Sequence, residues 1–416
     1  MFKFLHAADI HLDSPLKGLS RYEGMPADEI RLATRHAFDR LVRLAIEERV
    51  QFIVIAGDLY DGDWKDASTG LFFSARMSRL RDQGIHVYLI KGNHDASSVV
   101  TKSLHLPEEN THLFDSRKAH SLEVPGVPAV IHGRSFPDRH VDENFAAGYP
   151  PRDPSRFNIG MLHTSLTGFE EHATYAPCTV DDLHAKGYEY WALGHVHTAQ
   201  EICGSDPYIV FPGNIQGRSI RETGAKGCRI ITVDDAHRVS SCTFHALDVF
   251  RWQLLEIDVT GAASISEVEQ SVEKAIRAME QAPDCRYILR IILKGETPLA
   301  AHLLSTEDWR DSLRALATNT GSERIWLEKI ETRCQPPRQT RNLDGPLAEV
   351  AASMRSLNAE EIAELFAPLR QKLPDEAKAQ LSSMLDPASP EYAALLAEVE
   401  ALVGARLGGQ AVTHAD

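Results

Sequence analysis

Potential metal ligands follow short apolar segments at five points in the N-terminal half of the chain. They are carboxylates, an amide and imidazoles: Asp9, His11, Asp58, Asn93, His163, His195 and His197. Oxygen and imidazole ligands without a thiolate suit manganese, iron(II), zinc or magnesium. Seven groups are too many for one ion. Two ions about 3.5–4 Å apart, bridged by one carboxylate, fit this number and form the usual arrangement for in-line attack of water at phosphorus.

Each of these motifs also has a purely structural explanation when it is considered alone. The segment 92–95 (Gly-Asn-His-Asp) has the composition of a turn, because Gly, Asn and Asp accept positive φ or hydrogen-bond their own backbone. Asp9 and His11 fit a helix cap, and His163 fits a core histidine. Asp61 either tunes the site or caps its own turn. The ordered occurrence of these residues at successive strand ends favours a metal site.

The apolar segments before these residues are predicted to be buried strands, with two amphipathic helices between them. Strands are expected over 2–8, 51–56, 86–91, 129–133, 157–163 and 189–193, and helices over 29–48 and 67–83. This alternation predicts a layered α/β sheet, in which functional groups gather at the carboxyl ends of strands. The later runs 208–211, 229–234 and 240–246 lack long helices between them and are predicted to be antiparallel.

A second α/β unit and a helical C-terminal region are predicted to follow. Strands are expected over 252–259, 286–294 and 324–331, and helices over 264–280 and 303–317. Ser264 and Glu267 have the spacing of a capping box. After a Pro-rich segment, Ser389 precedes an apolar stripe that either packs on its own protein or docks on a partner. The predicted divisions are a first domain over 1–247, a second over 248–333, a linker over 334–346 and a helical region over 347–416.

The composition is typical of a globular protein, with 43% hydrophobic and 25% charged residues. No apolar run approaches the roughly 20 residues of a membrane span, and the opening residues do not resemble a signal peptide. We therefore expect a cytoplasmic protein with no membrane contact. The six scattered cysteines form no CxxC pair, which argues against a thiolate zinc site or a disulfide framework. A net charge of −15 argues against binding nucleic acid by bulk charge alone.

The order D-x-H, G-D-x-x-D, G-N-H-D, a lone His and G-H-x-H resembles the signature of the calcineurin-like metallophosphoesterases. The segments ADIHLDSPL, AGDLYDGDW, IKGNHD, YWALGHVHTAQ and FPGNIQGRSIRETGAKG are similar to those of the nuclease subunit of SbcCD-type double-strand-break repair exonucleases, especially the YhaO-like branch. This resemblance implies an α/β/β/α sandwich, a small α/β domain that caps the site and contacts DNA, and a helical C-terminal tail.

The resemblance implies a role for each ligand at two divalent ions, expected to be Mn²⁺. The first ion would be held by Asp9, His11, Asp58 and His197. The second would be held by Asp58, Asn93, His163 and His195, so that Asp58 is the bridge.

The neighbouring residues are expected to serve the substrate. His94 would assist the leaving 3′-oxygen as an acid, and Asp95 would orient its imidazole by a hydrogen bond. Three basic residues either grip DNA phosphates or belong to a solvated loop: Arg218, Arg221 and Lys226. Three aromatic residues either stack on an unpaired base or pack in the protein: Tyr60, Trp64 and Tyr175. Compared with the better-known branch, HLG is replaced by HLD and the last motif is GHVHT, which affects substrate binding rather than the metals.

The leading functional hypothesis is a metal-dependent DNA phosphodiesterase that acts in repair or end processing. One alternative is a phosphatase or a small-molecule phosphodiesterase of the same superfamily, although GDLYDGD lacks the arginine of the phosphatase motif GDxVDRG. The other alternative is mainly a binding subunit. The resemblance implies an SMC-like ATPase with a long coiled coil as partner, and a homodimer.

Overall fold

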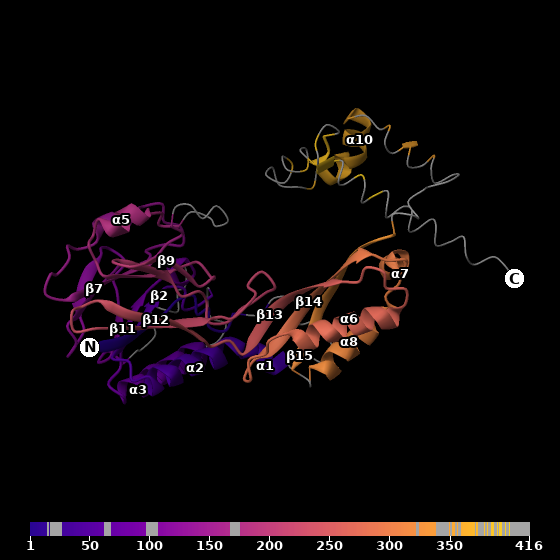
Figure 1. Cartoon of the computed structure of the whole chain (residues 1–416). Helices are drawn as coiled ribbons and strands as arrows, with labels where there is room; N and C mark the ends of the chain where they lie inside the picture. Colours follow the sequence, from indigo (N-terminus) through magenta and orange to yellow (C-terminus); the bar gives the residue numbers. More distant parts are fainter. Residues whose placement is uncertain are drawn as a thin grey trace. The chain divides into compact units, whose positions relative to one another are not determined.

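The computed structural model divides the chain into two compact units (Figure 1). The first comprises Met1–Gln253 and Gln281–Ile288, and the second comprises Leu254–Glu280 and Leu289–Asp416. The structure describes residues 1–14, 16, 27–61, 68–96, 107–166, 175–321 and 324–337, and between 349 and 399 it describes the helix 359–370 and isolated positions.

One sheet of the first unit contains the strands that lead into the first three ligand motifs. Its order is β12-β11-β1-β2-β3-β4. Strands β1 to β4 are parallel, whereas β11 and β12 are antiparallel to their neighbours. The strands are β1 (Phe2–Ala7), β2 (Phe52–Ala56), β3 (His86–Ile90), β4 (Thr111–Leu113), β11 (Gly227–Val233) and β12 (Val239–Ala246).

The other sheet contains the strands that lead into the later histidines. Its order is β5-β6-β7-β8-β10-β9, with a parallel centre and antiparallel edge strands. The strands are β5 (His120–Glu123), β6 (Ala129–Gly133), β7 (Phe157–His163), β8 (Tyr190–Gly194), β9 (Gln200–Gly204) and β10 (Tyr208–Phe211).

The alternation of side chains along the strands places one layer on each face of each sheet. On β2, Phe52 and Val54 pack against the second sheet, whereas Ile53 and Ile55 pack against helices. These helices are α2 (Ala33–Glu47) and α3 (Ser68–Arg81), and Figure 1 shows both on the outer side of the first sheet. On the far side of the second sheet, α5 (Val180–His184) packs against Trp191 and Leu193 through Leu183. The predicted α/β/β/α sandwich is therefore confirmed.

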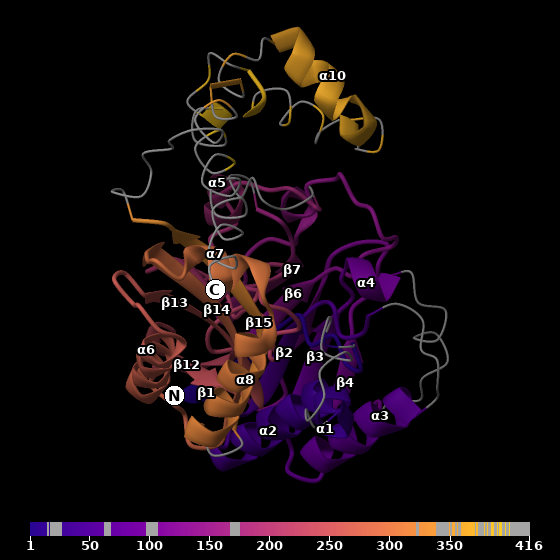
Figure 2. The same cartoon turned by 90° about the vertical axis from the view of Figure 1, so that its right-hand side faces the viewer.

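The second unit is a three-stranded sheet covered by helices on one face (Figure 2). The strand order is β13-β14-β15, and α6 and α8 lie side by side on the sheet. The elements are β13 (Phe250–Asp258), α6 (Ile265–Ala278), β14 (Arg286–Glu296), α7 (Ala300–Ser305), α8 (Asp308–Thr320) and β15 (Ile325–Gln335). The capping box is half formed: Ser264 Oγ accepts from Glu267 N–H, but the Glu267 carboxylate accepts from Ala263 N–H.

Some predicted elements differ from the observed ones for local reasons. The helix predicted over 29–48 is divided into α1 (Ala27–Arg31) and α2, and the one predicted over 303–317 is α7 and α8, separated by an extended Thr306. Strand β10 is antiparallel to β9 but parallel to β8. The short strands β4, β5 and β9 were missed because their sequences, THL, HSLE and QEICG, mix polar and apolar residues and lack the apolar run that marks the other short strands. The predicted linker begins inside β15, where Cys334 is buried.

Two further expectations concern the chain outside the sheets. Helix α10 (Ala359–Arg370) lies in the region predicted to be helical, and Ser389 Oγ accepts from Tyr392 N–H as an N-cap would. Three of the six residues of the apolar stripe after Ser389, namely Leu395, Leu402 and Val403, lie outside the described residues. All six cysteines are free. Within the described part of the chain, no helix is long and apolar enough to cross a membrane.

The fully buried His6 should make the first unit acid-sensitive. Its Nδ1 contacts the Tyr190 hydroxyl and its Nε2 contacts Leu193 O; burial lowers the pKa of His6 to about 3. The unfolded chain, with a pKa near 6.5, binds the proton first. The free energy of unfolding should therefore fall as pH drops below about 6.5, by up to about 1.4 kcal/mol per pH unit from this group.

Urea unfolding of chelated protein between pH 7.5 and pH 5 checks this expectation. In His6→Gln, the slope of the unfolding free energy against pH should be smaller by the amount that corresponds to about one bound proton. His36→Gln, on the exposed side of α2, provides the same chemical change as a control. Equal slopes in the wild type and His6→Gln would contradict the prediction.

Candidate metal centre

The predicted ligands converge because parallel strands of both sheets end at the same edge. Asp9 follows β1, Asp58 follows β2 and Asn93 follows β3, while His163 ends β7 and His195 follows β8. The carboxyl ends of parallel strands are the usual place for such groups. The site therefore takes ligands from both layers of the sandwich.

One cluster contains His11, His197 and Asp9. The Nε2 atoms of His11 and His197 lie 3.2 Å apart, and His197 Nε2 lies 3.9 Å from Asp9 Oδ1. One ligand atom of each residue lies within 4.8 Å of the others. Asp58 Oδ2 lies 3.9 Å from His11 Nε2 and so borders the same cluster.

A second cluster contains His163, Asp58 and Asn93. His163 Nε2 lies 2.9 Å from Asn93 Oδ1 and 3.4 Å from Asp58 Oδ2. Asp9 also belongs to it, because one carboxylate oxygen of Asp9 lies within 4.8 Å of a carboxylate oxygen of Asp58 and of a ring nitrogen of His163. The His195 ring lies beside His163, with ring centroids 5.2 Å apart. The two clusters share carboxylates, as a pair of neighbouring ions requires.

The hydrogen bonds behind the imidazoles leave lone pairs directed into these clusters. His163 Nδ1 lies 2.9 Å from Ala56 O, and His197 Nδ1 lies 2.7 Å from Glu222 Oε1. Because both oxygens only accept, each Nδ1 carries a hydrogen, so that each ring in its neutral form keeps its lone pair on Nε2. That lone pair faces other acceptors, including Asn93 Oδ1. Converging acceptors repel one another unless a cation lies between them, so this donor set fits divalent metal ions.

Burial and mutual charge determine the protonation of the buried carboxylates. Burial raises the pKa of Asp9. Burial also acts to raise the pKa of Asp58, but the His163 imidazole outweighs it and the pKa falls well below its usual range. Conversely, burial acts to lower the pKa of His163, but Asp58 raises it to about 9. Without a metal, His163 therefore carries a second hydrogen on Nε2, facing Asp58, in the place that a bound cation would take. Burial holds the pKa of His11 well below its usual value, which keeps this ring neutral and able to ligate.

Several ligands occupy backbone conformations that non-glycine residues rarely adopt. The φ angles are +51° for Asp9, +46° for His11, +51° for Asp58 and +103° for His195. Each such residue costs about 1–3 kcal/mol and persists only where its surroundings fix it. Here Asp9 N–H donates to Gly57 O, and His11 N–H donates to Asp58 O, both at 3.0 Å. The strain turns consecutive side chains toward one point.

His94 lies beside the first cluster, and Asp61 rather than Asp95 orients it. His94 Nδ1 lies 2.7 Å from Asp61 Oδ1, and this bond raises the pKa of His94. The predicted role of Asp95 is wrong: its carboxylate accepts from the amides of Gly92, Leu59 and Tyr60. Asp95 lies in the short helix α4 (Asn93–Ala96), where it is buried and binds the amides of the loops that follow β2 and β3.

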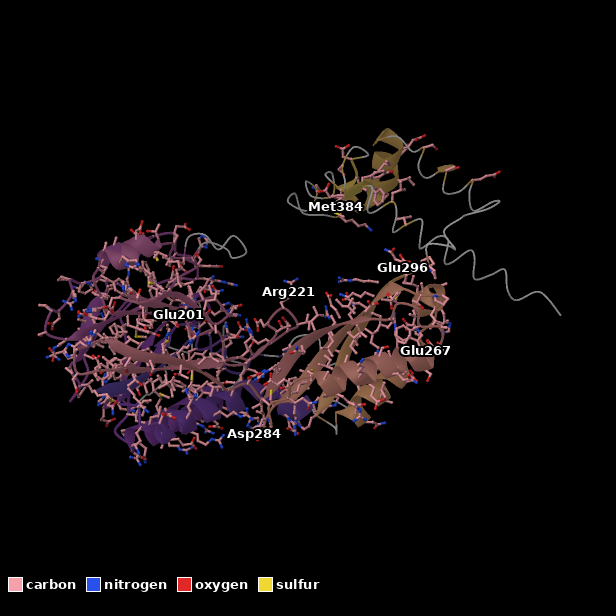
Figure 3. All side chains as sticks on the ribbon, viewed as in Figure 1. Glu201, Arg221, Glu267, Asp284, Glu296 and Met384 are labelled. Carbon is pink, nitrogen blue, oxygen red and sulfur yellow. The ribbon has the colours of Figure 1, made fainter. Side chains whose placement is uncertain are left out.

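The predicted substrate-binding residues differ in exposure. The prediction is wrong for Lys226, which is buried and donates to His197 O at 2.9 Å. Arg218 is mostly buried, and its Nη1 lies 3.6 Å from Asp61 Oδ2. Arg221 is exposed and points away from the ribbon (Figure 3).

The predicted aromatic residues also differ in their surroundings. Tyr60 is fully buried in the core between α3 and the first sheet, so it cannot stack on a base. Tyr175 lies next to the His195 ring, with centroids 5.0 Å apart. Trp64 lies outside the described residues.

The prediction from sequence missed Glu222 and left the role of Asp61 open. Glu222 lies in the segment QGRSIRETGAKG, which contains the predicted arginines, yet no spacing relates it to His197. Although burial opposes it, the hydrogen bond with His197 lowers the pKa of Glu222 well below its usual range. Only the folded loop reveals this contact.

Comparison with known proteins agrees with this geometry. Residues 2–199 match the model of the calcineurin-like phosphoesterases, and residues 252–335 match the middle domain of the metallophosphoesterase YhaO. The uncharacterized metallophosphoesterase YhaO of Bacillus subtilis is 35% identical over 351 residues, covering 82% of this chain and 84% of that protein. The chain belongs to the calcineurin-like metallophosphoesterase family.

More distant relatives of this metallophosphoesterase include two proteins named DNA double-strand break repair protein Mre11. The one from Sulfolobus acidocaldarius is 25% identical over 348 residues, covering 79% of this chain and 83% of its own. The one from Methanopyrus kandleri is 23% identical over 356 residues, covering 80% of this chain and 71% of its own. The chain is thus a phosphoester hydrolase of a family that uses divalent metals, consistent with the YhaO-like branch.

Gly92 is expected to be required for the metal centre of the metallophosphoesterase. A Cβ atom at Gly92 would lie 2.2 Å from Asp58 Oδ1 and 2.7 Å from Asp58 N. Gly92→Ala should therefore displace Asp58, destabilise the fold by about 1–3 kcal/mol and weaken Mn²⁺ binding by more than about tenfold. Calorimetric metal titration and thermal unfolding measure both effects.

Gly148 provides the control, because a Cβ there meets no atom within 4 Å. Gly148→Ala should leave metal affinity and thermal unfolding unchanged. Wild-type metal affinity in Gly92→Ala would show that the close approach to Asp58 is not needed.

Asp61 is expected to keep His94 protonated. Because its hydrogen bond is the main cause of the raised His94 pKa, Asp61→Asn should lower that pKa. An NMR titration of the metal-free protein reports it directly. If His94 acts as an acid, the alkaline limb of kcat/KM should move to lower pH in the variant.

Asp311→Asn, on the exposed surface of α8, controls for the loss of a carboxylate. An unchanged His94 pKa in Asp61→Asn would mean that the 2.7 Å contact does not determine the charge of this imidazole.

Proposed function

We propose that this metallophosphoesterase is a metal-dependent DNA phosphodiesterase that processes DNA ends. The observation that carries the proposal is the pair of ligand clusters sharing buried carboxylates, with His94 beside them. This arrangement supports hydrolysis of a phosphodiester, because water activated by two metal ions would attack phosphorus without a serine or cysteine nucleophile.

The chain supplies distinct groups for binding and for proton transfer. Asp9, His11, Asp58 and His197 would hold one ion, and Asp58, Asn93, His163 and His195 the other; manganese is the proposed metal. When bound, the two ions would supply activated water and neutralise charge at phosphorus.

Proton transfer to the leaving group would fall to His94. Its imidazole is 31% exposed, and Asp61 holds it from behind through Nδ1. Its Nε2–H would donate to the 3′-oxygen that leaves. The raised pKa favours the protonated form that this role needs.

Similarity to proteins named for DNA double-strand break repair supports DNA as the substrate. The similarity extends over about four fifths of this chain, including the second unit. The exposed Arg221 and the partly exposed Arg218 lie on a loop that also contacts His197. Local arginines of this kind contact phosphates without requiring a basic protein overall.

His94→Ala tests the proposal. The variant should still bind two Mn²⁺ ions, but hydrolysis of end-labelled linear DNA should fall about 10²- to 10⁴-fold, as expected for loss of a general acid. His184→Ala, exposed near the end of α5, should hydrolyse DNA at the wild-type rate.

Two outcomes would contradict the proposal. Undiminished DNA hydrolysis by a folded His94→Ala protein would remove His94 from the mechanism. Faster turnover of phosphopeptides or cyclic nucleotides than of linear DNA would assign the chain to the phosphatases or small-molecule phosphodiesterases of the family.

A partner ATPase with a coiled coil and a homodimer stay predictions. Half of the apolar stripe proposed for docking lies outside the described residues. Pull-down experiments with a chain lacking residues 389–416 address its role directly.

A further inference from the structure

The Glu222 carboxylate collects hydrogen-bond donors from three residues around the first cluster. Oε1 lies 2.7 Å from His197 Nδ1 and 3.5 Å from Arg218 Nη2. Oε2 accepts from Arg218 N–H at 2.7 Å and from Asn214 Nδ2 at 2.9 Å. The Glu222 side chain is only 15% exposed. One buried carboxylate therefore joins a metal-ligand histidine to the loop around it.

The backbone carbonyl of His197 is bound separately from its ring, by Lys226 and Asn214. His197 O accepts from Lys226 Nζ at 2.9 Å and lies 3.4 Å from Asn214 N. The main chain of His197 is thus fixed by contacts that do not involve its ring. The ring needs its own partner to determine which nitrogen carries the hydrogen, and Glu222 is at the shortest distance.

Two groups compete for His197 Nδ1, and they favour opposite tautomers. The Glu222 carboxylate at 2.7 Å accepts, which places the hydrogen on Nδ1 and the lone pair on Nε2. Arg218 Nη2 at 3.4 Å only donates, which would place the lone pair on Nδ1. The shorter, charge-assisted bond prevails. Without Glu222, Arg218 would favour the tautomer whose Nε2 cannot bind a metal.

We propose that Glu222 is a positioning residue that sets the tautomer of His197, so that the Nε2 lone pair points toward Asp9 and His11. The inference rests on the metal centre in the proposed function, but it does not depend on DNA being the substrate. The segment 216–227 would then help to bind the metal through Glu222, besides carrying the exposed Arg221.

A carboxylate is required here because both of its oxygens face donors. In Glu222→Gln, an amide oxygen that accepts from Arg218 N–H and Asn214 Nδ2 would turn the amide NH₂ toward His197 Nδ1. The NH₂ group would then donate to Nδ1 and move the hydrogen to Nε2. Glu222→Gln keeps the size of the side chain while reversing the hydrogen bond, which makes it a sharp test.

The tautomer can be measured without any metal. In ¹⁵N-histidine-labelled, metal-free protein at pH 8, two-bond ¹H–¹⁵N correlation spectra should show His197 protonated on Nδ1 in the wild type and on Nε2 in Glu222→Gln. Loss of the signal in His197→Asn assigns it. Calorimetric titration with Mn²⁺ should show one of two sites weakened about 10- to 100-fold in Glu222→Gln.

Glu201→Gln, on β9 of the same unit (Figure 3), provides the same chemical change at a partly exposed side chain. It should keep the His197 tautomer and both Mn²⁺ affinities. An Nε2-protonated His197 in the wild type would overturn the proposal even if Glu222→Gln failed to fold. A folded Glu222→Gln with the wild-type tautomer and Mn²⁺ affinities would also overturn it. Absence of DNA hydrolysis by the wild type would reject the proposed substrate and leave this inference standing.

Discussion

The burial of two neighbouring carboxylates is the constraint on which the rest of the site depends. Asp9 and Asp58 are each 1% exposed, in a place where water cannot solvate their charge. Burying such charges is tolerated only when they are paired and hydrogen-bonded. Surrounding imidazoles and backbone amides provide this partly, and the remaining negative charge attracts cations. The glycines near Asp58, including Gly92, let the chain approach closely enough to enclose it.

The same constraint explains the strained loops. A strand that continued straight would carry successive residues away from the edge of the sheet, by about 3.3 Å per residue. Left-handed residues at the strand ends turn the chain instead, so that Asp9 and His11 both stay at one point. The large core between and outside the sheets fixes these conformations. The packing of the core thus offsets the strain of these ligand positions, as is usual where strained residues form a functional site.

The sequence predicted the sandwich and the gathering of ligands because both follow from local patterns, namely apolar strands and the polar residues directly after them. Asp95 was assigned to His94 because the two are adjacent, but the Asp95 carboxylate accepts from backbone amides instead. Asp61, from another strand end, takes that place. Burial of Lys226 and the contact of Glu222 depend on how a loop folds against His197. Side-chain direction after a strand and loop packing are tertiary properties, so periodicity does not reveal them.

The division of the ligands between two sheets has a consequence for biosynthesis. Asp9, Asp58 and Asn93 follow strands of one sheet, whereas His163 and His195 belong to strand ends of the other. Neither sheet alone contains a complete set. A nascent chain therefore has no working centre until residue 197 has left the ribosome and both layers have packed together. The hydrolase therefore cannot act before the later histidines have been synthesised.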